Sequence, residues 1–198
     1  MDPFKRRTHT GEAAAGATLH PVICGVDELM QFRRCGFTHI VSIMDPGSDV
    51  PTVFETFDAH QRLDLRFHDI IDPDSDMVVP NGEHIGELLR FGRAMYASKS
   101  SIKLLAHCHA GVSRSSAAAT LMLAAAQPGA PAQAFSRLLA IAPNAWPNLR
   151  MIELGDALLG CNGQLVAAAR AHYANMIERY PALRQMIAVD KHLRATRE

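Results

Sequence analysis

A cysteine and an arginine six positions apart are the residues of this sequence best placed to do chemistry. Cys108 and Arg114 enclose a short segment that contains Gly111, and Ser115 follows directly. If the segment wraps into a tight loop, its backbone N–H groups converge and form an anion site. Arg114 adds a planar guanidinium that can hold two phosphate oxygens. The same positive field favours the thiolate form of Cys108, which is the nucleophilic form.

The flanking residues predict the elements that would position this loop. Residues 102 to 106 form a short apolar run typical of a buried strand, and residues 115 to 126 form an Ala-rich segment that favours a helix. The reactive segment therefore joins a strand to a helix. In open parallel sheets, such loops at the carboxyl ends of strands are where ligands bind.

The rest of the chain predicts an α/β fold with a central, mostly parallel sheet flanked by helices. We expect three further strands, four further helices in the second half and two in the first half. The strands fall at 20–25, 39–44 and 63–67, and the helices at 26–35, 82–97, 132–142, 148–159, 164–172 and 182–194.

Composition indicates a soluble chain and narrows the function classes. The chain has 198 residues, of which 48% are apolar, and its formal net charge is zero. That balance of charges argues against non-specific electrostatic binding of nucleic acid. No apolar run is long enough for a membrane span, and the N-terminus does not resemble a secretory signal. We expect a loose arm over residues 1–18, one domain over residues 19–198 and a cytoplasmic location.

Four cysteines are spread along the chain without the short spacing of a metal site. Free thiols in a reducing compartment are the simplest interpretation. Cys24, Cys35 and Cys161 lie in apolar or helical contexts, so we expect them to be buried packing residues.

The reactive segment resembles the signature loop of the cysteine-dependent protein tyrosine phosphatase superfamily, His-Cys-x5-Arg-Ser/Thr. It is most similar to the dual-specificity and bacterial branches. The segment that carries this resemblance reads His107-Cys108-His109-Ala110-Gly111-Val112-Ser113-Arg114-Ser115. The resemblance implies a phosphocysteine intermediate formed without metal or organic cofactor.

Within that resemblance, each position of the loop has an implied role. Cys108 is the nucleophile, Arg114 binds phosphate, Ser115 helps the sulfur leave, and His107 orients the loop. The substrate-binding set is the run from the second histidine to the arginine: His109, Ala110, Gly111, Val112, Ser113 and Arg114. For Ser115 the alternative is a hydroxyl that caps the following helix, and for His109 the alternative is a side chain that only faces solvent.

A general acid must protonate the leaving oxygen, and an acidic segment after residues 63–67 offers candidates. Asp69 fits best, because the superfamily places its acid just after such a strand. Asp72 is the alternative general acid, and Asp76 is a third candidate. Carboxylates held close together favour protonation of one of them.

The function these residues predict is hydrolysis of a phosphomonoester, with a phosphotyrosine-containing protein or peptide as substrate and phosphate as product. The variable loop positions carry no Lys or Arg, which argues against a multiply charged headgroup as the substrate. Three alternatives stay open: a phosphatase of a phosphoinositide, inositol or RNA 5′ phosphate; a non-catalytic module that binds phosphorylated residues; and a redox or arsenate-reducing thiol protein.

Overall fold

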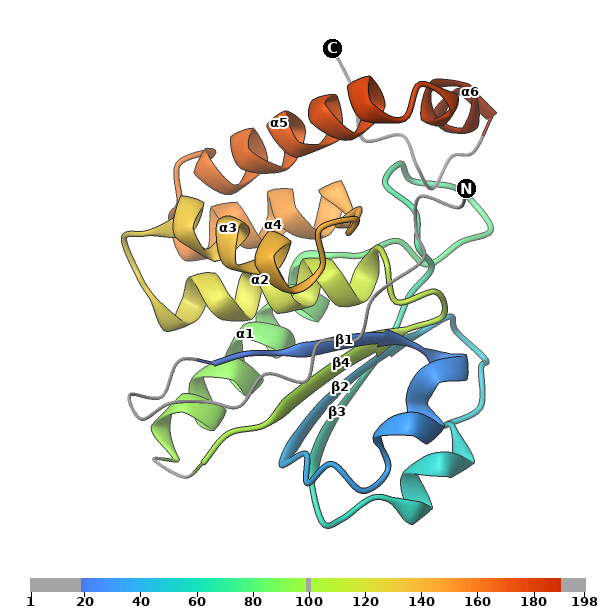
Figure 1. Ribbon diagram of the computed structural model, residues 1–198, viewed down its shortest axis with the longest axis vertical. Helices are drawn as coiled ribbons and strands as arrows, with labels where there is room; N and C mark the ends of the chain where they lie inside the picture. The colour runs from blue at the N-terminus through green and yellow to red at the C-terminus, as the bar shows by residue number, and fades with distance from the viewer. Residues whose placement is uncertain (1–18, 99–100, 190–198) are drawn as a thin grey trace.

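One four-stranded parallel sheet organises the described part of the chain. The computed structural model describes residues 19–98 and 101–189. The strands lie in the order β1 (Val22–Gly25), β4 (Leu104–Cys108), β2 (His39–Met44) and β3 (Gln61–Arg66) (Figure 1). Every pair is parallel. The carboxyl ends of all four strands therefore meet at one edge of the sheet, and so do the loops that follow them.

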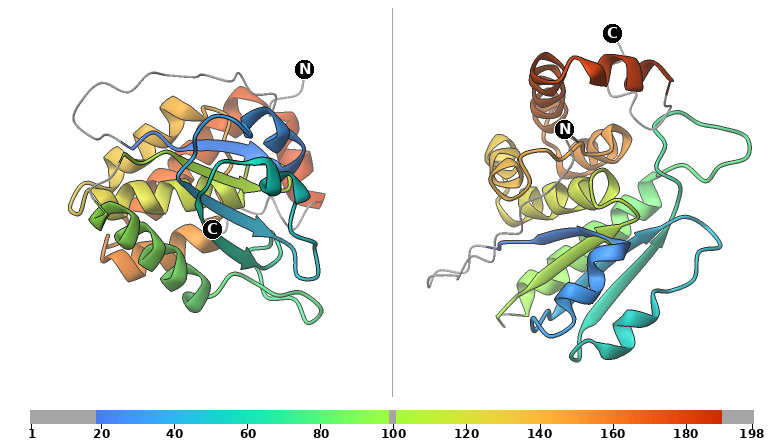
Figure 2. Two further views of the ribbon diagram at one scale, coloured as in Figure 1. Left: turned by 90° about the horizontal axis from the view of Figure 1, so that it is seen from below. Right: turned by 45° about the vertical axis from the view of Figure 1, so that its right-hand side comes forward.

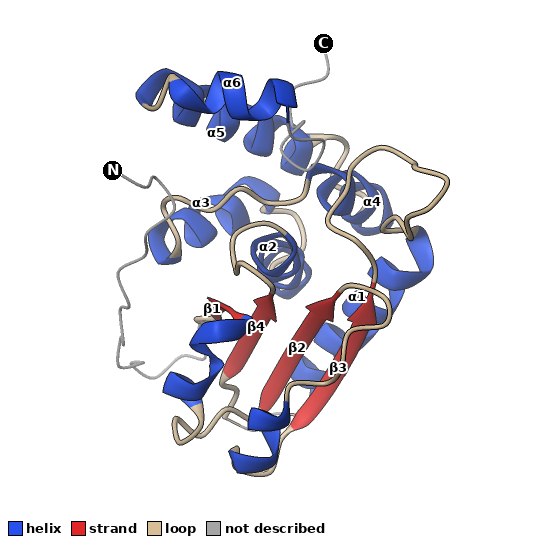
Figure 3. Ribbon diagram, turned by 90° about the vertical axis from the view of Figure 1, so that its right-hand side faces the viewer, coloured by secondary structure: helices blue, strands red, loops and turns tan. Residues whose placement is uncertain are grey.

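In the described part of the chain, six α-helices cover one face of the sheet or pack on helices that do, while two short 3-10 helices lie against the other face (Figures 1 and 3). The α-helices are α1 (Gly82–Ala97), α2 (Arg114–Ala126), α3 (Pro131–Ile141), α4 (Leu149–Leu159), α5 (Gln164–Arg179) and α6 (Ala182–Val189). The 3-10 helices are η1 (Val26–Phe32) and η2 (Thr52–Thr56).

Helix α2 is the centre of the larger core. It packs against the sheet and against α1, α3 and α4. Eleven of its thirteen residues are buried, from Arg114 to Ala124. A helix that is apolar on nearly every side has to be surrounded, and the alanine-rich sequence lets its neighbours approach closely. The start of α2, where the reactive loop ends, is therefore fixed by contacts on several sides.

A smaller apolar cluster supports the opposite face of the sheet. Leu29 of η1 and Phe54 of η2 pack on Ile40 and Leu105 of the strands. Consecutive strand residues point to opposite faces, so Ala106 and Cys108 lie on the helical face while Leu105 lies here. The two clusters together make the sheet a buried central layer.

Most predicted elements are confirmed, with shifted ends. Strand β2 and helix α1 have the predicted bounds, and Asn81 caps α1 by accepting a hydrogen bond from the His84 amide. Strand β4 begins later than predicted and extends through Cys108. Helix α5 continues to Arg179, past the predicted end. The expected arm over residues 1–18, and the end of the last predicted helix beyond residue 189, lie outside the described residues.

One predicted helix and the predicted burial of two cysteines are wrong, and one short helix was missed. Residues 26–35 form a 3-10 helix that ends at Phe32, because only Leu29 is buried and no apolar stripe is available to stabilise an α-helix. Helix η2 was not predicted at all. Cys35 is exposed rather than buried, since it follows the end of η1, and Cys161 is only partly buried. None of the four cysteines, all of which lie within the described residues, forms a disulfide.

Within the described part of the chain, no helix is both long and apolar enough to cross a bilayer.

Candidate active site

The reactive segment is a tight loop between β4 and α2, and one glycine allows it to close. Gly111 has a φ of +67°, in the left-handed region. A Cβ atom at this position would lie 2.2 Å from the carbonyl carbon of Cys24. Both the backbone conformation and the close approach of β1 therefore require glycine. The amide of Val26 also donates to the carbonyl of His109 at 2.9 Å, which ties the loop to the end of β1.

The sulfur of Cys108 lies at the floor of this loop among polar groups. The Gly111 amide donates to Sγ at 3.2 Å, and the Ser115 hydroxyl lies 3.3 Å from it. The residue is only 1% exposed. The sulfur also lies beside the amino-terminal end of α2, where helix dipoles favour negative charge. Amide, hydroxyl and helix end can all stabilise a thiolate.

The three guanidinium nitrogens of Arg114 face four different neighbours. Nη1 donates to Asp45 Oδ1 and to the carbonyl of Phe67, both at 2.6 Å. Nη2 lies 3.1 Å from Nδ1 of His109. Nε is buried and has no hydrogen-bond acceptor in range among the described residues; its nearest carboxylate oxygen there is Asp69 Oδ2 at 3.7 Å. One edge of the guanidinium is thus anchored, and the other, with Nε and Nη2, can still bind an anion.

Asp69 is the predicted acid that the fold brings to the loop. Its Oδ1 accepts hydrogen bonds from the Ser113 hydroxyl at 2.7 Å and from the Asn148 side-chain amide at 2.9 Å. Its Oδ2 is the oxygen that faces Arg114. These contacts hold the carboxyl group beside the guanidinium, within a side chain that is 23% exposed. The structure brings Asp69, Arg114 and the Cys108 loop together at one sheet edge.

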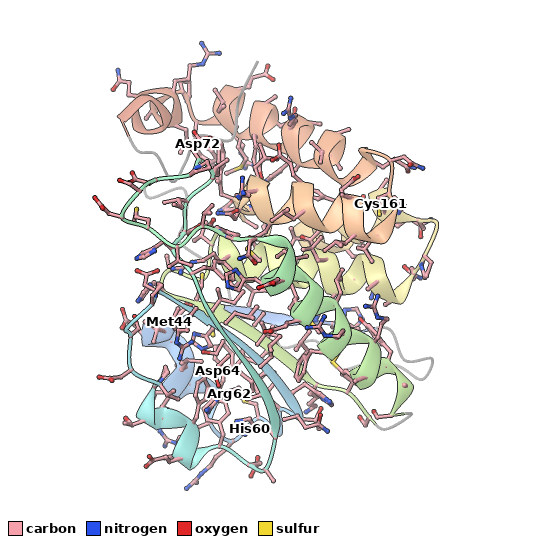
Figure 4. All side chains as sticks on the ribbon, turned by 180° about the vertical axis from the view of Figure 1, so that it is seen from behind. Met44, His60, Arg62, Asp64, Asp72 and Cys161 are labelled. Carbon is pink, nitrogen blue, oxygen red and sulfur yellow. The ribbon has the colours of Figure 1, made fainter. Side chains whose placement is uncertain are left out.

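The other candidate acids lie further along the same connection. The backbone of His68 pairs with Val78, with the His68 amide donating to the Val78 carbonyl at 2.8 Å. This pairing closes the base of a loop that stands out from the body of the molecule (Figure 2). Asp72 lies in that loop, well separated in Figure 4 from Met44 at the end of β2. Asp76 is exposed in the same loop.

His107 lies beneath the loop rather than in it. Its ring is fully buried and packs 5.4 Å from the ring of Phe54, between the centroids, on the face of the sheet that carries the 3-10 helices. Burial lowers the pKa of His107 to about 4, and the Cys108 backbone offsets this only in part. The imidazole is therefore neutral near pH 7.

The variable positions of the loop divide into an exposed and a supported half. His109 and Ala110 are exposed at its mouth. Val112 and Ser113 are half-buried, and their carbonyls accept hydrogen bonds from the amides of Trp146 and Asn148. The connection between α3 and α4 thus supports the second half of the loop from below.

Two residues that bear on the site were not predicted to do so, Asp45 and Asn148. Asp45 opens the Asp-Pro-Gly turn after β2, and that position at the carboxyl end of a central strand was the available signal. Asn148 caps α4 by accepting from the Met151 amide, and its side-chain amide contacts Asp69. A cap signal alone does not reveal the second contact.

Within residues 19–98 and 101–189, no three His, Cys, Asp or Glu side chains gather in a way that could hold a metal ion. The metal-free chemistry implied by the sequence stays a prediction.

Comparison with known proteins identifies the class of fold. No family model and no curated protein matches the chain. Solved structures do match, and the chain has the fold of the tyrosine and dual-specificity phosphatases among them, which is the fold that the resemblance implied.

Three of these structures illustrate the match. Human DUSP28 is 21% identical, with 70% of this chain and 87% of that chain covered at a TM-score of 0.52. The PTP-2 phosphatase of Cydia pomonella is also 21% identical, with 68% and 83% covered and a TM-score of 0.52. DUSP15 is 17% identical, with 81% and 94% covered and a TM-score of 0.51. At these identities the likeness concerns the fold.

Proposed function

We propose that the protein hydrolyses phosphomonoesters through a phosphocysteine intermediate. The observation that carries the proposal is the position of the Cys108 sulfur, which contacts a loop amide and the Ser115 hydroxyl at the start of α2. Arg114 and Asp69 come to the same sheet edge from α2 and from the connection after β3. Nucleophile, anion-binding guanidinium and proton donor are the three groups that such a reaction needs.

In the first step, the Cys108 thiolate attacks phosphorus in line while the bond from phosphorus to the leaving oxygen breaks. The loop amides and the free edge of Arg114 hold the phosphoryl oxygens. Asp69 gives its proton to the leaving oxygen, which departs as an alcohol or phenol.

In the second step, a water molecule gives a proton to Asp69 and attacks phosphorus, and the sulfur leaves as thiolate. The Ser115 hydroxyl, 3.3 Å from the sulfur, can donate to it as the negative charge returns. The products are phosphate and the enzyme with Asp69 protonated again.

A phosphotyrosine side chain in a protein or peptide is the substrate that the site supports best. His109 and Ala110, at the exposed mouth, carry no fixed positive charge. A multiply phosphorylated headgroup would find only one arginine in the loop itself. The cytoplasmic location expected from the sequence fits such a substrate and stays a prediction.

The test is a substrate panel run beside a nucleophile variant. The panel holds a phosphotyrosine peptide, an inositol phosphate and an RNA 5′ phosphate. We expect turnover of the peptide to exceed that of the other two. Preference for either of the others would contradict the substrate assignment, and absence of turnover would favour a binding module.

Cys108→Ser should abolish turnover and still bind phosphopeptide, because the loop amides and Arg114 remain. The matched control is Cys35→Ser, which changes an exposed thiol and should leave activity unchanged. Residual activity above about one per cent in Cys108→Ser would contradict the nucleophile assignment. Such activity would mean that the substitution raises the activation barrier by less than roughly 3 kcal/mol.

A further inference from the structure

Helix α5 lies on the side of α3 and α4 that faces away from the sheet, and it packs on both helices (Figure 1). Two adjacent buried side chains of α5 contact the connection between α3 and α4. Nε2 of His172 lies 2.7 Å from the carbonyl oxygen of Ala145, and the Tyr173 hydroxyl donates to the carbonyl of Pro147. A carbonyl oxygen only accepts, so His172 carries a proton on Nε2 in this contact.

The connection between α3 and α4 carries these contacts to the reactive loop. In a trans peptide group the carbonyl and the amide point in opposite directions. The carbonyl of Ala145 faces α5, and the amide of Trp146 in the same peptide donates to the carbonyl of Val112 at 3.0 Å. The Trp146 ring stacks on the Tyr173 ring with 4.6 Å between the centroids. This peptide group therefore bridges α5 and the second half of the loop.

A second peptide group makes the same bridge and also reaches the candidate acid. The carbonyl of Pro147 accepts from Tyr173, and the amide of Asn148 donates to the carbonyl of Ser113 at 3.3 Å. The side-chain amide of Asn148 donates to Oδ1 of Asp69 at 2.9 Å. The Tyr173 hydroxyl therefore holds the carbonyl directly before the residue that contacts the acid.

We infer that Tyr173 is a positioning residue for the phosphatase reaction, which fixes the peptide between Pro147 and Asn148 so that Asn148 holds the Asp69 carboxyl group beside the reactive loop. The inference rests on the proposed function. Tyr173 does not touch the reacting atoms and acts through Asn148.

The surroundings of the Tyr173 hydroxyl suit a permanent donor. The side chain is fully buried. Burial raises the pKa of Tyr173, and the carboxylates of Glu153 and Asp69 raise it further. The phenol therefore keeps its proton, and its contact with the Pro147 carbonyl persists at any pH at which the reaction is measured.

A purely structural role for this hydroxyl predicts a different outcome, which makes the inference testable. Loss of a buried hydrogen bond destabilises the fold, and any general disturbance of the site slows all substrates alike. If the hydroxyl positions the acid, its removal slows most the substrates whose leaving oxygen needs a proton. The dependence of the rate on the leaving group therefore separates the two roles.

The experiment compares Tyr173→Phe and Tyr96→Phe with the unchanged chain. Phenylalanine keeps the ring that stacks on Trp146, so the first variant should fold. Tyr96 is the matched control, because its hydroxyl also donates to a backbone carbonyl, that of Met122 at 3.0 Å, far along α2 from the reactive loop. We measure kcat/KM for an alkyl and an aryl phosphate, the inhibition constant of inorganic phosphate and the melting temperature.

Tyr173→Phe should lower kcat/KM for the alkyl ester by roughly 5- to 10-fold, as expected for loss of one neutral hydrogen bond. The loss for the aryl ester should be less than about 2-fold, because phenolate departs more easily without a proton. Phosphate inhibition should be unchanged, since Arg114 and the loop amides remain. Tyr96→Phe should lower the melting temperature without changing the ratio of the two rates.

The same substitution in an Asp69→Asn background completes the test. Because Tyr173 acts on the acid, Tyr173→Phe should then cause no further loss with the alkyl ester. Unchanged rates, an equal loss for both esters, or a loss repeated in full in the Asp69→Asn background would overturn the inference while leaving the proposed function intact. An unchanged chain without turnover would overturn both.

Discussion

The two carboxylate oxygens of Asp69 have different surroundings, and this difference suits a proton donor. Oδ1 accepts from Ser113 and Asn148, so its lone pairs are occupied and the group is held in place. Oδ2 lies 3.7 Å from Nε of Arg114, on the side of the reactive loop, and we propose that it is the oxygen that carries the proton. A phosphate held by Arg114 would bring its leaving oxygen to this side of the loop.

Asp69→Asn tests that role through the leaving group. We expect about a 100-fold or greater loss with an alkyl phosphate, and a much smaller loss with an aryl phosphate, because phenolate departs more easily without a proton. The measurement is kcat/KM for matched alkyl and aryl esters. If Asp72→Asn gives that pattern and Asp69→Asn does not, the acid is the residue in the projecting loop.

The burial of His107 leads to a prediction about the stability of the fold rather than the rate of the reaction. Its pKa falls from an ordinary 6.5 to about 4 in the folded chain because the ring is buried. The unfolded chain therefore binds the proton first as pH falls. The contribution of His107 to the free energy of unfolding is therefore fully present above pH 6.5. It decreases by roughly 3 kcal/mol as the pH falls from 6.5 toward 4.

Urea denaturation of the unchanged chain and of His107→Asn at several pH values measures this difference. Other histidines and the carboxylates titrate in both proteins, so the comparison isolates His107. We expect the free energy of unfolding to fall less steeply between pH 6.5 and 4 in the variant. Parallel curves would show that the imidazole is not buried in its neutral form.

At the scale of elements, the site depends on how closely α2 and α4 pack. Gly155 of α4 meets Leu121 of α2, and a Cβ atom there would lie 2.1 Å from Cδ2 of that leucine. The same two helices begin at Arg114 and just after Asn148, which both contribute to the site. Spacing between the helices and geometry of the site are therefore linked.

Gly155→Ala should lower the free energy of unfolding by about 1–3 kcal/mol, the usual cost of overpacking a core. Gly86→Ala is the control, since its Cβ would meet only the end of the flexible Arg90 side chain at 3.4 Å. That variant should be neutral or stabilised by up to about 1 kcal/mol, from the better helix propensity of alanine. Equal effects of the two substitutions in chemical denaturation would contradict the packing account.

Elements with a strong local pattern could be predicted, and those determined by tertiary contacts could not. The buried run of β2 and the Asn81 cap of α1 gave correct bounds. Helix α5 exceeds its prediction because His172, Tyr173 and Met176 are buried against the rest of the fold, which its sequence pattern indicates only weakly. Cys35 lies in the turn from η1 to β2 and is exposed. Its local sequence did not predict this, because burial in that turn depends on segments that are distant in the chain.

At the scale of the whole molecule, the parallel sheet explains why distant residues form one site. Asp45, Asp69 and Cys108 follow or end three neighbouring strands, β2, β3 and β4. The sequence indicated the loop and the best candidate acid, since both carry local patterns. It did not indicate that Asp45 meets Arg114, because that contact requires the order of the strands, which no local pattern specifies.

The most direct test of the central claim is to trap the covalent intermediate. The protein is mixed with an aryl phosphate, quenched in acid within one turnover, digested and examined by mass spectrometry. We predict one phosphoryl group on the peptide that contains Cys108, absent from Cys108→Ser. Product formed with no phosphoryl group on that peptide, or with the group on another residue, would contradict the account.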